Sequence, residues 1–339
     1  MNPDSRLTID DSRPGRSCPL AYRYSPASLA RDPELIADAV YIVGGLYGNR
    51  PALESVLDLA AAEPGRAAVV FNGDFNWFNV DRDGFESVNR TVLGHTALRG
   101  NVETELAAND PTAGCGCCAY PEWVSDAEVE RSNTIMERLR DASRAFPALR
   151  AALGQLPMNL TARVGGARVA IVHGDAESLS GWGFAQEALD GPRQLERIGR
   201  WFDEARVDIF AGSHTCLPVS CELPGGRVVA NNGAAGMPNF RATRHGVVTR
   251  IGVTPAPAVE ALYAIRTGNT YVEALPVHYD AARFEREFLS NWPAGSPAHE
   301  SYHGRIARGP SYEPARAVRR HAAPKRSRGV HPLPQEDPT

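Results

Sequence analysis

Residues 39–63, AVYIVGGLYGNRPALESVLDLAAAE, combine a short apolar run with a helical pattern. The run AVYIV has the length and the β-branched content of a buried strand, and two glycines end it. Pro51, followed by apolar residues three and four positions apart, predicts a helix over 51–63. The stretch is therefore predicted to form a βα unit with a glycine-rich connecting loop.

The same arrangement returns along the chain. Strands that alternate with helices predict an α/β core, and glycine-containing hairpins later in the chain favour a mixed or two-sheet sandwich over a purely parallel sheet. Further strands are predicted at 66–74, 95–101 and 208–212, and helices at 125–142 and 192–204. Residues 162–175 are predicted to form a hairpin with its turn at 165–166 and a buried strand as its second arm, and two more hairpin turns are predicted at 225–226 and 268–269.

Composition limits the class of protein. A chain of 339 residues that is 43% hydrophobic can bury a large core, and it has no apolar run long enough to span a membrane. Its polar N-terminus lacks the apolar centre of a signal peptide, so we expect a cytoplasmic protein whose six cysteines are reduced. The net charge of -4 predicts no general affinity for nucleic acid.

The two ends differ in composition from the middle. We expect an N-terminal extension over 1–37, one domain over 38–290, and a disordered tail over 291–339 that is rich in proline and arginine. The tail could contact nucleic acid or an acidic partner. A solvated tail is the preferred interpretation, because no aromatic residue lies among the arginines after Tyr312.

Polar side chains follow four of the predicted strands: Asp74, Asn101, His173 and His214. Ligand sites of α/β folds lie at the carboxyl ends of strands, so these four side chains are expected to meet. A carboxylate, an amide oxygen and two imidazoles suit Mn, Fe(II) or Zn. Each residue could instead be a turn residue or a hydrogen-bonded core group, but the joint pattern favours a metal site.

The ordered segments GGLYGN (44–49), GD (73–74), GN (100–101), HG (173–174), SHT (213–215) and NNGAAGMPNF (231–240) resemble the motifs of the calcineurin-like metallophosphoesterases. The resemblance covers about residues 38–280. It implies a four-layer α/β/β/α sandwich and two metal ions that activate a water molecule and bind a phosphate oxygen.

The resemblance divides the site into two halves. The ligands of the family's second metal correspond to Asp74, Asn101, His173 and His214, and all four are present. The family's first metal is bound by the aspartate and histidine of D-x-H and by the second histidine of G-H-x-H, and this chain has other residues at these three positions. The replacing residues are Gly45, Tyr47 and Cys216. One metal is therefore expected, and a second would need unusual ligands: Tyr47 and Cys216 could bind iron or zinc as phenolate and thiolate.

Two further departures affect the expected chemistry. The histidine that follows G-N in many members, and that protonates the leaving oxygen, is replaced by Val102. The insertion PTAGCGCCAYPEW (111–123) follows this motif, so Cys115, Cys117 and Cys118 are either additional metal ligands or buried residues of a structural turn. Trp182, Asn239 and Phe240 could form pocket walls, although core packing is preferred for the aromatic residues.

Two functions follow from these observations. The first is a metal-dependent phosphoesterase that acts on a small phosphorylated substrate with one metal or an altered metal pair. The second is a catalytically impaired protein of the same fold that keeps one metal for structure or ligand binding. Gly45 favours the second function because it has no side chain to coordinate a metal, whereas the presence of all four ligands of the second metal favours the first, which is the preferred interpretation.

Overall fold

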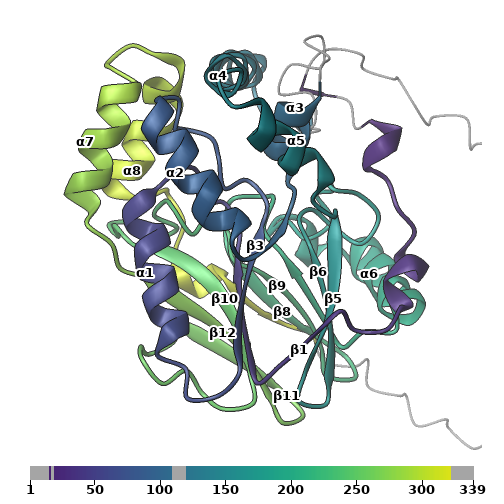
Figure 1. Cartoon of the computed structure of the whole chain (residues 1–339). Helices are drawn as coiled ribbons and strands as arrows, with labels where there is room; N and C mark the ends of the chain where they lie inside the picture. Colours follow the sequence, from purple (N-terminus) through teal and green to yellow (C-terminus); the bar gives the residue numbers. More distant parts are fainter. Residues whose placement is uncertain (1–14, 17–18, 109–119, 322–339) are drawn as a thin grey trace, which may run out of the picture.

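A computed structural model describes residues 15–16, 19–108 and 120–321. Within this part, the strands form two mixed sheets that pack face to face (Figure 1). The six-stranded sheet has the order β11-β12-β10-β2-β3-β4, and the seven-stranded sheet has the order β1-β5-β6-β7-β9-β8-β13. The first contains β2 (Ala39–Val43), β3 (Ala67–Asn72), β4 (Thr96–Leu98), β10 (Gly246–Gly252), β11 (Tyr263–Thr267) and β12 (Thr270–Val277). The second contains β1 (Leu35–Ala37), β5 (Asn159–Val164), β6 (Ala167–Val172), β7 (Ile209–Gly212), β8 (Val219–Leu223), β9 (Arg227–Asn231) and β13 (Val318–Arg320).

Strand β2 shows why both faces of a sheet are covered. Val40 and Ile42 pack in the cluster between the two sheets, whereas Tyr41 and Val43 pack in the cluster beneath the outer helices. Successive side chains of a strand point to opposite faces, so a continuous apolar strand needs a layer on each side. Strand β6 alternates in the same way between the inner cluster and the cluster under α6.

Helices provide the two outer layers. The six-stranded sheet is covered by α1 (Arg50–Ala61), α2 (Arg82–Leu93) and α7 (Ala281–Asn291). The seven-stranded sheet is covered by α6 (Pro192–Ala205) and the short helix η2 (Pro26–Ala30). The predicted four-layer α/β/β/α sandwich with mixed sheets is thereby confirmed, as are the three predicted hairpins.

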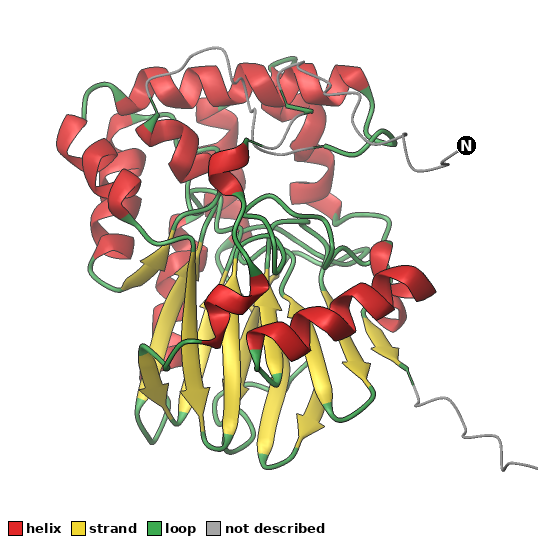
Figure 2. Cartoon of the chain, turned by 90° about the vertical axis from the view of Figure 1, so that its right-hand side faces the viewer, coloured by secondary structure: helices red, strands yellow, loops and turns green. Residues whose placement is uncertain are grey.

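A group of helices lies beyond one end of the sandwich (Figure 2). It comprises α3 (Asn101–Ala107), α4 (Asp126–Ser143) and α5 (Pro147–Gln155). Ser125 caps the N-terminus of α4: its side chain accepts from the N–H of Glu128, whose carboxylate accepts from the N–H of Ser125. No described helix is both long and apolar enough to cross a membrane.

The predicted N-terminal extension is wrong for residues 19–37. Strand β1 pairs with β5 in parallel, and Leu29 of η2 is buried against α6. The sequence signal was weak because β1 has only three residues and lies at the sheet edge.

The predicted disordered tail is wrong for residues 291–321. Helix α8 (Gly304–Arg308) packs beside α7, and β13 pairs with β8. Trp292, Tyr302 and Tyr312 belong to or pack against the hydrophobic clusters, and such aromatic residues are uncommon in disordered segments. Residues 322–339 lie outside the described part of the chain.

Candidate metal centre

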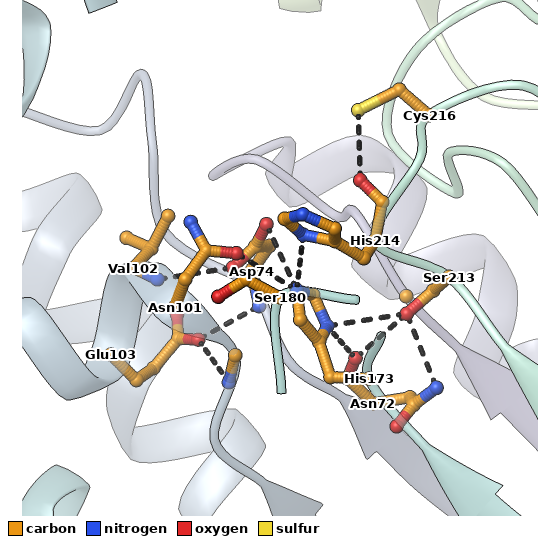
Figure 3. Close-up of polar contacts among 12 residues, drawn as sticks. Asn72, Asp74, Asn101, Val102, Glu103, His173, Ser180, Ser213, His214 and Cys216 are labelled. Carbon is orange, nitrogen blue, oxygen red and sulfur yellow. Dashed lines mark hydrogen bonds and ion pairs between the residues drawn. The ribbon is translucent and has the colours of Figure 1, made fainter. Parts of the chain in front are cut away.

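The four predicted ligands come from four different loops at one end of the sandwich. Asp74 follows β3, Asn101 begins α3 after β4, His173 follows β6, and His214 follows β7. All four side chains are buried, and Figure 3 shows them turned toward a common point. The structure therefore brings together the residues that the sequence predicted would meet.

Glycines before two of these residues allow the loops to approach each other. A Cβ at Gly73 would lie 2.5 Å from Gly100 Cα and 2.6 Å from His173 Nδ1. A Cβ at Gly100 would lie 2.3 Å from Asp74 Oδ1. Such distances are too short for non-bonded atoms, so the G-D and G-N pairs are required by the close packing of the site itself.

The polar atoms converge on His173. Its Nε2 lies 3.0 Å from Asn101 Oδ1, 3.3 Å from Asp74 Oδ2 and 3.3 Å from His214 Nδ1. One ligand atom each from Asp74, His173 and His214 lies within 4.8 Å of the other two. These atoms carry lone pairs, so only protons or a cation can satisfy all of them at once.

The tautomer of His173 that suits metal binding is supported by the surrounding backbone. Its Nδ1 lies 2.8 Å from the carbonyl oxygen of Asn72, which can only accept a hydrogen bond. With Nδ1 donating, the Nε2 lone pair of a neutral ring points at the other ligands. Metal-binding histidines are commonly oriented by such a bond, so the described residues fit a divalent ion.

The charges of the centre act on one another. Burial alone would raise the pKa of Asp74, but the neighbouring His173 and His214 outweigh burial and lower it. Burial would lower the pKa of His173, but Asp74 and a hydrogen bond to it raise the pKa instead. The buried carboxylate is thus held in its charged form, as a metal ligand must be.

Glu103 supports the loop of Asp74 and was not identified from the sequence. Its carboxylate accepts from the backbone N–H groups of Asp74 at 2.7 Å, Gly100 at 3.0 Å and Asn76 at 3.2 Å. Burial and the charge of Asp74 raise the pKa of Glu103 to about 7. The available signal was a glutamate three residues after Gly100 at the start of α3, where capping glutamates occur.

The second half of the site has a different chemistry. Tyr47 Oη and Cys216 Sγ lie 2.8 Å apart and form a hydrogen bond, and Gly45 offers no ligand atom. The pKa of Tyr47 is raised well above its usual value, mainly by burial and further by the neighbouring Cys216 and Asp74. Burial also raises the pKa of the Cys216 thiol. Tyr47 and Cys216 are therefore neutral partners of each other, in contrast to the phenolate and thiolate considered from the sequence.

Backbone conformation marks the same loops. Tyr47, Asp74 and Cys216 have φ values of 55°, 52° and 62°, in the left-handed region that most residues avoid. Strained backbone conformations of this kind are common at functional sites, where the surrounding contacts stabilise them. Both halves of the site are therefore built on constrained loops.

A small cavity adjoins the two halves. Its volume is about 50 Å³, enough for a few water molecules or an ion with its ligands. Trp182 lies on its wall, whereas Asn239 and Phe240 are buried in local packing. The lining residues are Tyr47, Asp74, Trp77, Asn101, Val102, Tyr120, Trp182, His214, Cys216 and Tyr302.

The C-terminal segment contributes to this site. Tyr302 lines the cavity, and burial raises its pKa to about 12. Arg305 donates from Nη2 to the carbonyl of Cys216 at 2.7 Å and from Nε to the carbonyl of Pro238 at 2.8 Å. Sequence reasoning missed both residues because they lay in the expected tail. Cys115, Cys117 and Cys118 lie outside the described residues.

The comparisons with known proteins concern the fold. No protein-family model matches the sequence, and no curated protein matches it. A hypothetical protein, PH1004 from Pyrococcus horikoshii OT3, aligns with a TM-score of 0.53 and 14% identity, over 82% of this chain and 100% of that one. A metallophosphoesterase from Sphaerobacter thermophilus aligns with a TM-score of 0.49 and 17% identity, over 80% of this chain and 100% of that one.

The first of these likenesses shows a shared fold and carries no information about activity. The topology of the chain itself matches the class that the motifs predicted: two mixed sheets face to face, helices outside, and the motif residues together at one end. The chain therefore has the calcineurin-like metallophosphoesterase fold.

Proposed function

We propose that the protein is a metal-dependent phosphoesterase that works with one firmly bound metal ion. The observation that supports the proposal is the buried cluster of Asp74, His173 and His214, whose ligand atoms lie within 4.8 Å of one another beside a cavity. Asn101 would add an amide oxygen to this set. Two imidazoles with two oxygen ligands suit Mn, Fe or Zn.

A bound ion supplies Lewis acidity toward a phosphate oxygen and lowers the pKa of bound water. The chain positions the ligands: Glu103 holds the Asp74 loop, and Asn72 orients His173. Because the cavity is small, the phosphate would lie near the ligands and the remainder of a substrate would lie at the cavity mouth.

Val102 narrows the range of substrates. It is buried, lines the cavity, and has no group that can protonate a leaving oxygen. Esters whose leaving group is already stable as an anion need no such proton. The proposed activity therefore favours aryl phosphates and phosphoric anhydrides over simple alkyl esters.

The test measures phosphate release by the full chain, stripped of metal and then supplied with Mn, Fe(II), Zn or Mg. We expect hydrolysis of 4-nitrophenyl phosphate with at least one of the first three, and slower hydrolysis of glycerol 3-phosphate. The Asp74→Asn variant is the matched control for contaminating phosphatase. Activity that persists in this variant would show that the centre is not the source.

The second candidate is a catalytically impaired protein that keeps one metal for structure or ligand binding. The hydrogen bond between Tyr47 and Cys216 favours it, because this pair occupies the place of the ligands for a second ion. The same measurement separates the two. Metal binding without hydrolysis of any tested ester would support the impaired protein.

A further inference from the structure

An exposed tryptophan lies at the outer end of a series of rings that begins at the candidate metal centre. The Trp182 ring lies 5.6 Å from the His214 ring, at an interplanar angle of 78°. The Trp123 ring lies 6.2 Å from that of Trp182, at 89°, and is 68% exposed. The series therefore connects a metal ligand to solvent in two ring contacts.

The rings come from two separate loops. Trp123 precedes α4, whereas Trp182 follows β6 in the same loop as His173. Tyr120 adds a third ring 6.3 Å from Trp182, and it lines the cavity together with Trp182. Tyr120 and Trp182, which come from two different loops, thus line the same cavity, and Trp123 contacts Trp182.

The exposure of Trp123 is unusual. Tryptophan is on average highly buried, and among the other large hydrophobic side chains of the described part only Leu20 is more exposed. The exposed ring of Trp123, held against a cavity-lining tryptophan, offers a flat face on which a planar ligand could stack. Isolated exposed apolar residues are common, but this one is joined to the candidate centre by ring contacts.

We propose that Trp123 stacks on a planar aromatic group of the substrate whose phosphate lies at Asp74, His173 and His214. This inference rests on the proposed function. The substrate class is an aryl phosphate or a nucleoside anhydride. Both carry a flat ring outside the small cavity when their reacting phosphate lies inside it. Trp123 is then a specificity-determining residue, and Trp182 connects it to the centre.

The leaving group supports the same class. Val102 leaves the cavity without a proton donor at that position, which favours phenolic esters and anhydrides. Phenols and nucleoside anhydrides combine a stable leaving anion with an aromatic ring. The two observations come from different residues, so they support the class independently.

Equilibrium binding by calorimetry tests the inference on the full chain supplied with Zn or Mn. AMP and ribose 5-phosphate form a matched pair, since they differ only in the base. We expect AMP to bind on the order of 10-fold more tightly, as stacking on an aromatic side chain commonly contributes. The preference should fall to near unity in Trp123→Ala, persist in Trp123→Phe, and be unchanged in Leu289→Ala, an exposed apolar control on α7.

Other ligands distinguish a simple aryl group from a nucleoside and test whether Trp123 binds a different kind of group. Phenyl phosphate that binds as tightly as AMP would assign a simple aryl group, and tighter binding of AMP would assign a nucleoside. Phosphocholine that binds more tightly than either would overturn the inference, because it would show that Trp123 recognises a cation instead. Equal binding of AMP and ribose 5-phosphate in the wild type would also overturn it.

The outcome for this inference differs from that for the proposed function. Adenosine carries the ring without a phosphate. Trp123-dependent binding of adenosine and AMP without any hydrolysis would therefore support the stacking site and contradict the proposed phosphoesterase activity. Hydrolysis of 4-nitrophenyl phosphate, together with equal binding of AMP and ribose 5-phosphate, would support the phosphoesterase activity and contradict the stacking site. Absence of both would remove both.

Discussion

The two halves of the site lie side by side on the same rim, yet they satisfy their polar atoms in opposite ways. In the half formed by Asp74, Asn101, His173 and His214, one atom of each of the other three side chains lies 3.0 to 3.3 Å from His173 Nε2. In the other half, Tyr47 and Cys216 form a hydrogen bond between two neutral groups. The first arrangement needs a bound proton or a cation between its ligand atoms, and the second needs neither.

The comparison separates the fold from its chemistry. Both halves stand on loops with left-handed backbone at Tyr47, Asp74 and Cys216, so the loop geometry is the same kind in each. Only the side chains differ. The loops of the two halves are therefore similarly constrained, although their side chains have different chemistry.

The largest expected effect comes from a substitution that removes a ligand of the metal-binding half. His173→Ala removes the imidazole on which the other ligand atoms converge, and we expect at least a 100-fold loss of metal affinity, because even indirect supports of such ligands contribute 10- to 100-fold. Metal titration of the purified protein measures it. The matched control is His278→Ala, an exposed histidine elsewhere. Equal metal affinity in the two variants would contradict the assignment of the ligands.

A smaller effect concerns the support of the neutral half by the C-terminal segment. Arg305→Ala removes two hydrogen bonds from a guanidinium to the carbonyls of Cys216 and Pro238. We expect a loss of about 2 kcal/mol in the free energy of unfolding, measured by denaturant titration. Arg308→Ala is the control, because among the described residues its side chain forms no hydrogen bond. Similar losses in both variants would show that Arg305 has no special role.

The smallest expected effect comes from substitutions that remove the hydrogen bond between Tyr47 and Cys216 in the neutral half. Tyr47→Phe and Cys216→Ala each remove one partner of the hydrogen bond, so each should lower the free energy of unfolding by about 1 kcal/mol. The double variant should lose less than the sum, since no unpaired group remains. Additive losses in this double-mutant cycle would mean that the two side chains do not interact in solution.

Much of the core and the metal-binding half could be predicted from the sequence. Apolar runs that end in a glycine and a polar residue specify both the strand and the rim, so Asp74, Asn101, His173 and His214 could be placed without tertiary information. The glycines before Asp74 and Asn101 have the same cause, because the loops must approach closely.

The remainder depends on contacts between distant parts of the chain. Tyr47 and Cys216 are 169 positions apart, and no local pattern indicates that their side chains form a hydrogen bond. Arg305 and Tyr302 lie in a segment whose arginine and proline content resembles a disordered tail, although its aromatic residues pack on the domain. Glu103 acts through backbone N–H groups, so its role becomes visible only when the Asp74 loop is in place.

The number of metal ions per chain tests the central claim most directly. The reduced wild-type protein, supplied with Mn, Fe or Zn and freed of excess metal, should hold about one ion by elemental analysis. Restoring the family pattern with Gly45→Asp, Tyr47→His and Cys216→His should raise this to about two, and should raise hydrolysis of 4-nitrophenyl phosphate. Two ions in the wild type would contradict the account of the neutral half, and no bound ion in the wild type would contradict the metal centre itself.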